Sequence, residues 1–333
     1  MKLITFEVAA PRGAVERLGA IFEDSVVDLN AAYALLLGRQ GKPDAKLLAG
    51  ERVPPEINAF LGLGEEALKA ARQALEFVSE SPLPEGEAVV YAKDEVRRLA
   101  PVPRPGALRD FFAFEEHALK EAARRGEKLP PEWYDQPVYY KGNHREIYGP
   151  DAVIPWPAYT RRFDFELELA CVVGLRGRDL SPEEALRHIA GYTILNDFSA
   201  RDIQKSEMAC RMGPAKGKDF ATGLGPYLLT ADELPDPGNL AMTVYVNGEK
   251  WSSGNSSGRY WSFPLMLSHV SQEETVYPGD ILGSGSYHEG CGLDLGRWVK
   301  PGDVIELEIE KLGRLRQVVG EPKAQKRLKY PKS

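Results

Sequence analysis

The chain contains the segment Phe163-Asp164-Phe165-Glu166-Leu167-Glu168-Leu169-Ala170, in which two acids alternate with apolar residues. Because side chains of a strand alternate between its two faces, we expect Glu166 and Glu168 on the same face. Two like charges this close repel each other, and a hard divalent cation with its preference for oxygen ligands would remove that repulsion. A solvated strand that carries two unrelated glutamates is the alternative, and this segment alone does not decide between them.

A second segment, residues 195–204, places Asp197 directly after the apolar start of another predicted strand. A side chain at the end of a strand points out of the packed sheet, so Asp197 can reach a site there. Arg201 and Gln204 would share one face if a helical turn begins at this point. The alternative is an ordinary polar turn in which Asp202 balances the charge of Arg201.

Two further segments carry candidate catalytic groups. Lys218 lies in the glycine-containing loop 216–223, where the backbone can approach a ligand closely. His117 lies in an amphipathic stretch, residues 115–125, together with three acids. A neighbouring carboxylate raises the basicity of a histidine and fixes its tautomer, which suits a general base. A basic loop and a surface helix with charge pairs are the alternatives for these two segments.

The composition limits the classes of protein to consider. The chain has 333 residues, 43% of them hydrophobic and 27% charged, which is sufficient for a large buried core. The formal net charge of -7 argues against nucleic acid as a partner, because binding phosphates needs a basic patch. The three cysteines form no CxxC pair, so neither a disulfide framework nor a structural zinc site is expected. With no long apolar stretch in the chain, we expect a cytoplasmic protein without a membrane span.

The order of the predicted elements suggests two domains. Residues 1–95 are expected to form a small N-terminal domain, and residues 96–333 a catalytic domain that consists mostly of short strands. Proline-rich sequence at 81–87 and again at 101–106 is typical of an extended connection between them. The fold class expected from this pattern is mixed α+β with more strand than helix.

Several local signals predict where individual elements begin. Asn30 is expected to cap a helix that starts at Ala31, and a second helix is expected from Glu65 to Phe77. Ser181, followed by Pro182 and two glutamates, predicts a capping box. The dipeptide Asn247-Gly248 between two strand-like runs predicts a β-hairpin.

Taken together, in this order and at these spacings, the four segments resemble the fumarylacetoacetate hydrolase superfamily. The resemblance covers residues 104–317, and residues 196–204 are nearly a signature by themselves. The sequence Tyr277-Pro278-Gly279-Asp280-Ile281, with Gly283-Ser284-Gly285-Ser286 after it, adds a further element of the pattern. The resemblance implies a β roll in the C-terminal domain, a smaller N-terminal domain and a homodimer.

The resemblance also implies roles for individual residues. The metal carboxylates of the family correspond to Asp110, Glu166, Glu168 and Asp197. The catalytic histidine and lysine correspond to His117 and Lys218, and a hydroxyl near the metal to Thr222. Substrate-binding residues correspond to Tyr140, Arg201, Gln204 and Ser286. For the acid that partners the histidine the candidates, in falling order, are Glu289, Glu121 and Glu116.

These correspondences imply a metal-dependent hydrolase that cleaves a carbon–carbon bond in a β-dioxo acid, such as fumarylacetoacetate or another acylpyruvate. Fumarylacetoacetate would place the enzyme in aromatic amino acid catabolism. Mg²⁺ is the expected cofactor, and oxygen ligands suit Mn²⁺ and Ca²⁺ as well. A decarboxylase, isomerase or hydratase of the same superfamily, acting on a related 2-oxo acid, is the alternative. The expected partners are a small dioxo acid and a second copy of the chain, with no nucleic acid and no membrane.

Overall fold

The computed structural model describes residues 1–10, 13–80 and 88–324. The proline-rich segment expected at 81–87 lies outside the described residues. More of the described residues lie in strands than in helices, so the predicted mixed α+β class with more strand than helix is confirmed. Among the described residues, no helix combines the length and the apolar character that crossing a bilayer requires.

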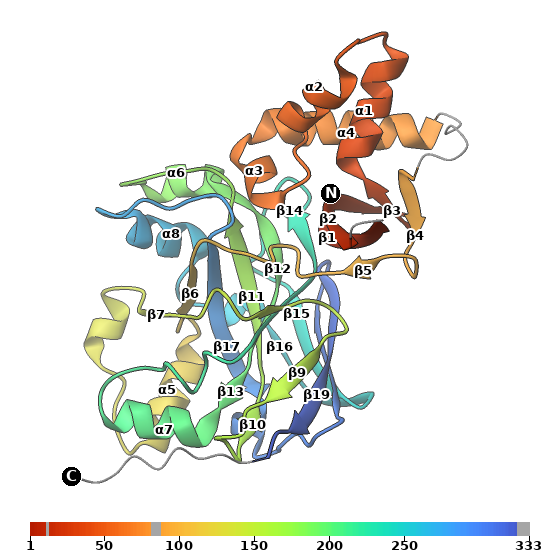
Figure 1. Ribbon diagram of the computed structural model, residues 1–333. Helices are drawn as coiled ribbons and strands as arrows, with labels where there is room; N and C mark the ends of the chain where they lie inside the picture. Colours follow the sequence, from red (N-terminus) through yellow and green to blue (C-terminus); the bar gives the residue numbers. More distant parts are fainter. Residues whose placement is uncertain (11–12, 81–87, 325–333) are drawn as a thin grey trace, which may run out of the picture.

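A large sheet, twelve-stranded over the described residues, forms the centre of the molecule (Figure 1). Its strands follow, in spatial order, β4 (Val90–Ala92), β3 (Ser25–Asp28), β2 (Gly13–Phe22), β1 (Lys2–Ala10), β14 (Thr222–Thr230), β12 (Ile189–Asp197), β11 (Glu166–Val173), β17 (Ile281–Cys291), β6 (Leu108–Phe111) and β7 (Tyr139–Lys141). Two short strands, β5 (Arg97–Arg98) and β8 (Ile147–Tyr148), pair with β1 and β14. Strands that are far apart in the sequence therefore lie side by side, and β11 pairs with both β12 and β17.

A second sheet packs against the large one. It contains β16 (Glu249–Asn255), β15 (Ala241–Val246), β18 (Val304–Ile309), β19 (Gly313–Pro322) and β9 (Val153–Trp156), and a separate pair joins β10 (Phe163–Asp164) to β13 (Ser199–Ala200). One hydrophobic cluster contains Leu169 from the large sheet and Leu307 from the second sheet, both fully buried. The alternating burial of β15 and β18 fits a strand with one face on the core.

The helices lie in three groups around the sheets (Figure 1). The N-terminal group contains α1 (Leu29–Arg39), α2 (Ala45–Arg52), α3 (Ile57–Gly62) and α4 (Glu65–Glu80). The second group contains α6 (Pro182–Arg187) and α8 (Phe263–Ser271). The third lies at the opposite end of the molecule and contains α5 (Glu115–Arg124) and α7 (Arg201–Ala209), with the single turn α9 (Gly292–Leu295) following β17. The 3₁₀ turns cover Pro131–Tyr134 and Ser256–Gly258.

Most of the local predictions agree with the structure. The helix from Glu65 is present, and it extends three residues beyond Phe77. Ser181 forms the predicted capping box with Glu184. Asn247 and Gly248 connect β15 and β16, with φ of 52° and 78°, as a two-residue hairpin turn requires.

One local prediction is wrong. Asn30 does not cap the first helix, because that helix begins at Leu29 and places Asn30 inside its first turn. Asp28 is the capping residue, and its carboxylate accepts a hydrogen bond from the Ala31 N–H at 3.0 Å. The Asn30 side chain instead donates to the carbonyl oxygen of Val53, the residue that directly follows α2. Both residue types are good caps, so the sequence alone does not distinguish these two adjacent positions.

The expected division at residues 95 and 96 falls within a continuous hydrogen-bonded structure. Strand β1 pairs with β14 through Lys2 and Leu3, so the N-terminal strands extend the large sheet. A single hydrophobic cluster joins the N-terminal helices to residues of β11 and β12. The division into domains 1–95 and 96–333 stays a prediction.

Candidate active site

Three carboxylates from three strands of the large sheet meet in the interior of the protein. Asp110 comes from β6, Glu168 from β11 and Asp197 from the end of β12, and all three are buried. One oxygen from each can be chosen so that all lie within 4.8 Å of one another. The sheet brings them together because β6 and β11 both pair with β17, and β11 also pairs with β12. We call these three residues the carboxylate cluster.

The donor set of this cluster fits a hard divalent cation. Within the part of the chain that the structure describes, the oxygens Asp110 Oδ1, Glu168 Oε1 and Asp197 Oδ1 are buried and have no hydrogen-bond partner. Buried polar atoms are normally paired, so three buried carboxylate oxygens without partners in one place are typical of residues that hold a cation. Burial, with the repulsion of neighbouring carboxylates, raises the pKa of all three acids. A bound cation would reverse this tendency, because it favours the ionised form.

A glycine leaves space beside the cluster. A Cβ atom on Gly283 would lie 2.7 Å from Glu168 Oε2 and 2.8 Å from Asp110 Oδ1, which is closer than atoms of these types approach. The neighbouring Gly285 donates its N–H to Glu168 Oε2 at 3.0 Å. Strand β17 therefore contributes backbone rather than side chains to this side of the cluster.

The fourth expected metal carboxylate, Glu166, lies next to the cluster but has cationic partners. Its Oε2 atom accepts a hydrogen bond from Lys218 Nζ at 2.6 Å, and its Oε1 atom accepts one from Arg201 Nη2 at 2.8 Å. Burial acts to raise the pKa of Glu166, but the charges of Arg201 and Lys218 outweigh it, and the pKa lies well below its usual value. Lys218 also pairs with Asp197, so it connects Glu166 to the cluster. A role of Glu166 as fourth ligand stays a proposal.

Burial also opposes the charge of Lys218. The carboxylates of Asp197 and Glu166 more than compensate, and the pKa of Lys218 lies above its usual value. This lysine is therefore a cation held inside the site rather than a free base. It is 4% exposed, and it is surrounded by acids because the loop 216–223 folds over the end of β12.

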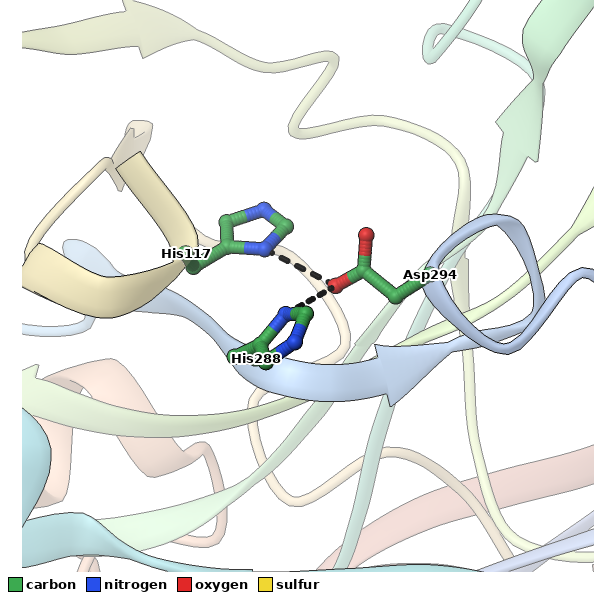
Figure 2. A group of neighbouring side chains, drawn as sticks. All are labelled: His117, His288 and Asp294. Atoms are coloured by element: carbon green, nitrogen blue, oxygen red, sulfur yellow. Dashed lines mark hydrogen bonds and ion pairs between the residues drawn. The ribbon is translucent and has the colours of Figure 1, made fainter. Parts of the chain in front are cut away.

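A histidine–carboxylate pair connects α5 to α9, and the side chain of His288 lies beside it (Figure 2). His117 Nδ1 is 3.0 Å from Asp294 Oδ2, and the Asp294 side chain is fully buried. Burial acts to raise the pKa of Asp294, but the hydrogen bond from His117 and the pairing with Arg124 lower it well below its usual value. His117 is close enough to the carboxylates for its charge to lower the pKa of Glu166 as well.

The acid in this pair differs from all three that the sequence suggested. Glu289 has an exposed side chain and contributes only its backbone N–H, which donates to Asp294 Oδ2 at 3.1 Å. Glu121 pairs with Arg124 and Arg125. Glu116, next to His117 in sequence, is exposed on the outer face of α5. Neighbours in a helix point in different directions, so the closest acids in sequence are not the closest in space.

The remaining expected site residues lie around the same centre. Tyr140 donates its hydroxyl hydrogen to Asp197 Oδ2 at 2.8 Å, and Gln204 accepts a hydrogen bond from Arg201 Nη1 at 3.0 Å. The predicted helical turn is present, since α7 begins at Arg201. Thr222 is buried at the start of β14, opposite Asp197 in the register of the two strands. Ser286 is buried on β17, opposite Glu168.

The sequence interpretation did not identify three residues of this region: Asp294, Asp164 and His288. Asp164 accepts hydrogen bonds from Arg201 Nε at 2.7 Å, from the Gly292 N–H at 2.9 Å and from the Leu293 N–H at 3.0 Å. His288 Nδ1 is 3.6 Å from Asp294 Oδ2. Asp164 precedes Glu166 by two residues in the same strand-like run. The alternation that indicated Glu166 and Glu168 therefore also pointed to Asp164. Asp294 follows the motif at Gly283 by eleven residues and had no local signal.

Comparison with known proteins identifies the class that this fold and site define. Residues 107–320 match the model of the fumarylacetoacetate (FAA) hydrolase C-terminal family. This match covers more than half of the chain, and the chain therefore belongs to the fumarylacetoacetate hydrolase family. The expectation drawn from the four sequence segments is confirmed.

Individual relatives show which activities occur in similar chains. The chain is 32% identical over 263 residues to a human mitochondrial oxaloacetate tautomerase, covering 78% of each chain. It is 33% identical over 284 residues to a 2,4-didehydro-3-deoxy-L-rhamnonate hydrolase of a Sphingomonas species, covering 84% of this chain and 90% of the relative. A fumarylacetoacetate hydrolase structure from Exiguobacterium antarcticum superimposes with a TM-score of 0.69 and 26% identity, over 96% of this chain and 99% of that one. All three names are those of enzymes.

Proposed function

We propose that the protein is a metal-dependent hydrolase that cleaves a carbon–carbon bond in a β-dioxo acid such as fumarylacetoacetate or another acylpyruvate. The observation that carries the proposal is the His117–Asp294 pair, because hydrolysis needs a base that activates water. Asp110 and His117 are seven residues apart at the junction of β6 and α5, and β17 leads from Gly283 at the cluster towards Asp294.

The cluster would hold the cation through Asp110, Glu168 and Asp197, and Glu166 is the proposed fourth ligand. Mg²⁺ is the proposed ion, and Mn²⁺ or Ca²⁺ would also suit oxygen donors. When bound, the cation polarises the carbonyl group of a dioxo acid and stabilises negative charge on the enolate that leaves. Tyr140 and Lys218 keep Asp197 oriented, since both donate to its Oδ2 atom.

Proton transfer belongs to the histidine pair. When the His117 Nδ1 atom carries the hydrogen, it donates to Asp294, and Nε2 is then free to take a proton from water. Asp294 stabilises the imidazolium that forms, because its own pKa is low and it stays ionised. Lys218, Arg201 and Gln204 are the proposed donors to the negative charge on the substrate oxygens, and the loss of one such donor typically raises a barrier by about 2.7–4 kcal/mol. Ser286, with Tyr140, is proposed to contact the substrate.

A tautomerase is the second candidate, and the similarity to the human oxaloacetate tautomerase favours it. In that reaction no water is consumed, and a base moves a proton between carbon and oxygen of one 2-oxo acid. The same carboxylate cluster could support either reaction, since both pass through an enolate. The two functions therefore differ in the product rather than in the cation.

An absorbance assay with product analysis tests the proposal. Purified protein with Mg²⁺ is given fumarylacetoacetate, a simple acylpyruvate or enol-oxaloacetate, with and without chelator. The hydrolase predicts loss of the dioxo chromophore together with release of two acids, and no loss for His117→Ala or in the presence of chelator. Ketonisation of oxaloacetate with intact acylpyruvates would contradict the hydrolase and support the tautomerase.

The proposal includes a cytoplasmic homodimer that acts in aromatic amino acid catabolism. The support for the dimer is the resemblance to the family, and for the pathway it is the proposed substrate. The human relative is named as mitochondrial, so location is tested separately, by fractionating cells that express the tagged chain. Light scattering on the purified protein tests the dimer, and the mass of a single chain would contradict it.

A further inference from the structure

Two imidazoles face the same carboxylate oxygen at the end of β17 (Figure 2). His117 Nδ1 lies 3.0 Å from Asp294 Oδ2, and His288 Nδ1 lies 3.6 Å from the same oxygen. One ligand atom from each of the three residues can be chosen so that all lie within 4.8 Å of one another. The arrangement brings together two of the five histidines of the chain, from α5 and β17, with an acid from α9.

The spacing of these atoms matches the edges of a tetrahedral metal site. Bonds of about 2.0–2.1 Å from Zn²⁺ to nitrogen and oxygen place tetrahedral ligand atoms about 3.3–3.4 Å apart. The two observed separations, 3.0 and 3.6 Å, lie on either side of that value. A set of two imidazoles and one carboxylate suits Zn²⁺ and similar transition metals, whereas the all-oxygen cluster suits Mg²⁺.

The partners of the three residues leave room for a cation, although Asp294 Oδ2 also accepts the Glu289 backbone N–H at 3.1 Å. Among the residues that the structure describes, His288 Nδ1 is a buried nitrogen with no hydrogen-bond partner. Arg124 donates to the other carboxylate oxygen, Asp294 Oδ1, at 2.6 Å, which directs Oδ2 towards the imidazoles. Arg124 is itself paired with Glu121, and this pair reduces the positive charge next to an incoming cation. The His288 side chain is 21% exposed, so an ion can reach the group from solvent.

We propose that His117, His288 and Asp294 form a second cation site, selective for a transition metal such as Zn²⁺ and separate from the carboxylate cluster. Binding releases the proton shared between His117 and Asp294, because the metal needs the lone pair of Nδ1. A bound ion takes Asp294 away from His117 and makes the imidazole a poorer base. The site would therefore give the enzyme a means of inhibition by transition metals, a consequence that rests on the proposed function of His117.

Binding experiments test the site without any substrate. Full-length protein is kept in excess Mg²⁺ to fill the carboxylate cluster and is titrated with Zn²⁺ by calorimetry and with Co²⁺ by visible absorption. Wild type and the matched control His188→Gln, at the end of α6, should bind one tight ion per chain with a tetrahedral Co²⁺ spectrum. His288→Gln should weaken this binding at least about 100-fold, because even changes to residues outside the ligand set cost about 10–100-fold.

The histidine ring signals of wild type give a second measurement that does not depend on a variant folding. Zn²⁺ should shift two of the five ring signals, those assigned to His117 and His288 through the variants, and leave the His188 signal in place. Unchanged His117 and His288 signals at saturating Zn²⁺, or equal affinity in His288→Gln and His188→Gln, would overturn the site.

Inhibition is then measured as the ratio of activity with Zn²⁺ to activity without it, for each protein separately. The ratio should fall steeply for wild type and His188→Gln, and it should stay near one for His288→Gln. Equal inhibition of His288→Gln would contradict the link between the site and the base. If no substrate is turned over at all, the proposed function fails, whereas the binding measurements still decide the metal site.

Discussion

Glu166 and Glu168 lie two residues apart on one strand, but their side chains have different partners. Glu168 belongs to the carboxylate cluster and has one buried oxygen without a hydrogen-bond partner among the described residues. Glu166 is held by Arg201 and Lys218. The pairing of β11 with β17 is irregular between these two residues, so the same face of the strand meets two different surroundings. Arg201 and Lys218 balance the charge of Glu166, whereas the proposed cation would balance the charge of Glu168.

The histidine pair gives a prediction for a single carboxylate. We expect Asp294→Asn to lower kcat by about 10²- to 10⁴-fold, because His117 then loses the acceptor that sets its tautomer and stabilises its positive charge. KM should change little, since Asp294 is proposed to act through His117 and not to contact the substrate. The matched control is Glu289→Gln, whose exposed side chain has no such contact, and its kcat should stay within about twofold of wild type. Steady-state kinetics at saturating Mg²⁺ measure both, and a larger loss in Glu289→Gln would contradict the assignment.

A second prediction concerns the glycine beside the cluster. Gly283→Ala should weaken Mg²⁺ binding about 10- to 100-fold, because the new methyl group displaces the carboxylates of Asp110 and Glu168. Gly50→Ala is the matched control. It lies within α2 with no atom near its added Cβ, and it should stabilise the fold by about 0.5–1 kcal/mol without affecting the metal. Calorimetric Mg²⁺ titration and urea unfolding measure the two effects, and unchanged Mg²⁺ affinity in Gly283→Ala would contradict the placement of the cation.

At the scale of elements, the end of β17 and the turn α9 form a unit that β10 holds in place. Asp164 of β10 accepts the backbone N–H groups of Gly292 and Leu293, the first residues of α9. The same carboxylate pairs with Arg201 at the start of α7. One buried acid therefore fixes both the turn that carries Asp294 and the helix that carries Arg201. It acts as a positioning residue, since it touches neither the histidine nor the carboxylate cluster.

This arrangement predicts coupling between Asp164 and Asp294. Asp164→Asn should destabilise the fold by about 1–3 kcal/mol, because charged hydrogen bonds in the interior become neutral or are lost. It should also lower kcat, since α9 no longer holds Asp294 firmly. In a double-mutant cycle with Asp294→Asn, the combined loss of kcat should be smaller than the product of the single losses, because both changes act on His117. Losses that multiply independently would show that Asp164 acts elsewhere.

At the scale of the whole molecule, we expect the free energy of unfolding to depend on both pH and the bound metal ion. Burial raises the pKa of Asp110, Glu168 and Asp197, so these three groups bind more protons in the folded protein without metal than in the unfolded chain. When the folded pKa is the higher one, stability is greatest below the unfolded pKa, near 4, and falls as the pH rises through the folded pKa. The proposed cation would keep the three carboxylates ionised and would remove this dependence.

The expected result is a stability profile that depends on metal. With chelator, the free energy of unfolding should decrease from about pH 5 upward, and with Mg²⁺ at about 100 times its Kd it should be higher by about 2.7 kcal/mol. Glu168→Gln should flatten the profile in chelator, because one titrating group is removed, and it should abolish the gain from Mg²⁺. Urea unfolding at a series of pH values measures this. Identical profiles with and without Mg²⁺ would contradict a cation at the cluster.

Features that depend on short spacings could be predicted from the amino-acid sequence. Alternation placed Glu166 and Glu168 on one strand, the dipeptide Asn247-Gly248 fixed a hairpin, and Ser181 fixed the start of α6. The sequence also identified the three acids of the carboxylate cluster, because each lies in a motif that is specific to the family. The strand, the hairpin and the capping box depend on contacts within a few residues, which strand and helix geometry dictate locally, whereas the acids of the cluster followed from the resemblance to the family.

The acid that partners His117 became evident only from the folded chain. Asp294 is 177 residues away in the sequence, and the two meet because β6 and β17 pair in parallel and the chain then turns into α9. The acids close to His117 in sequence point elsewhere, as the direction of side chains on a helix requires. The second imidazole, His288, and the positioning residue Asp164 depend on the same packing. Pairing between distant strands has no local signature, and so these contacts followed from the folded sheet alone.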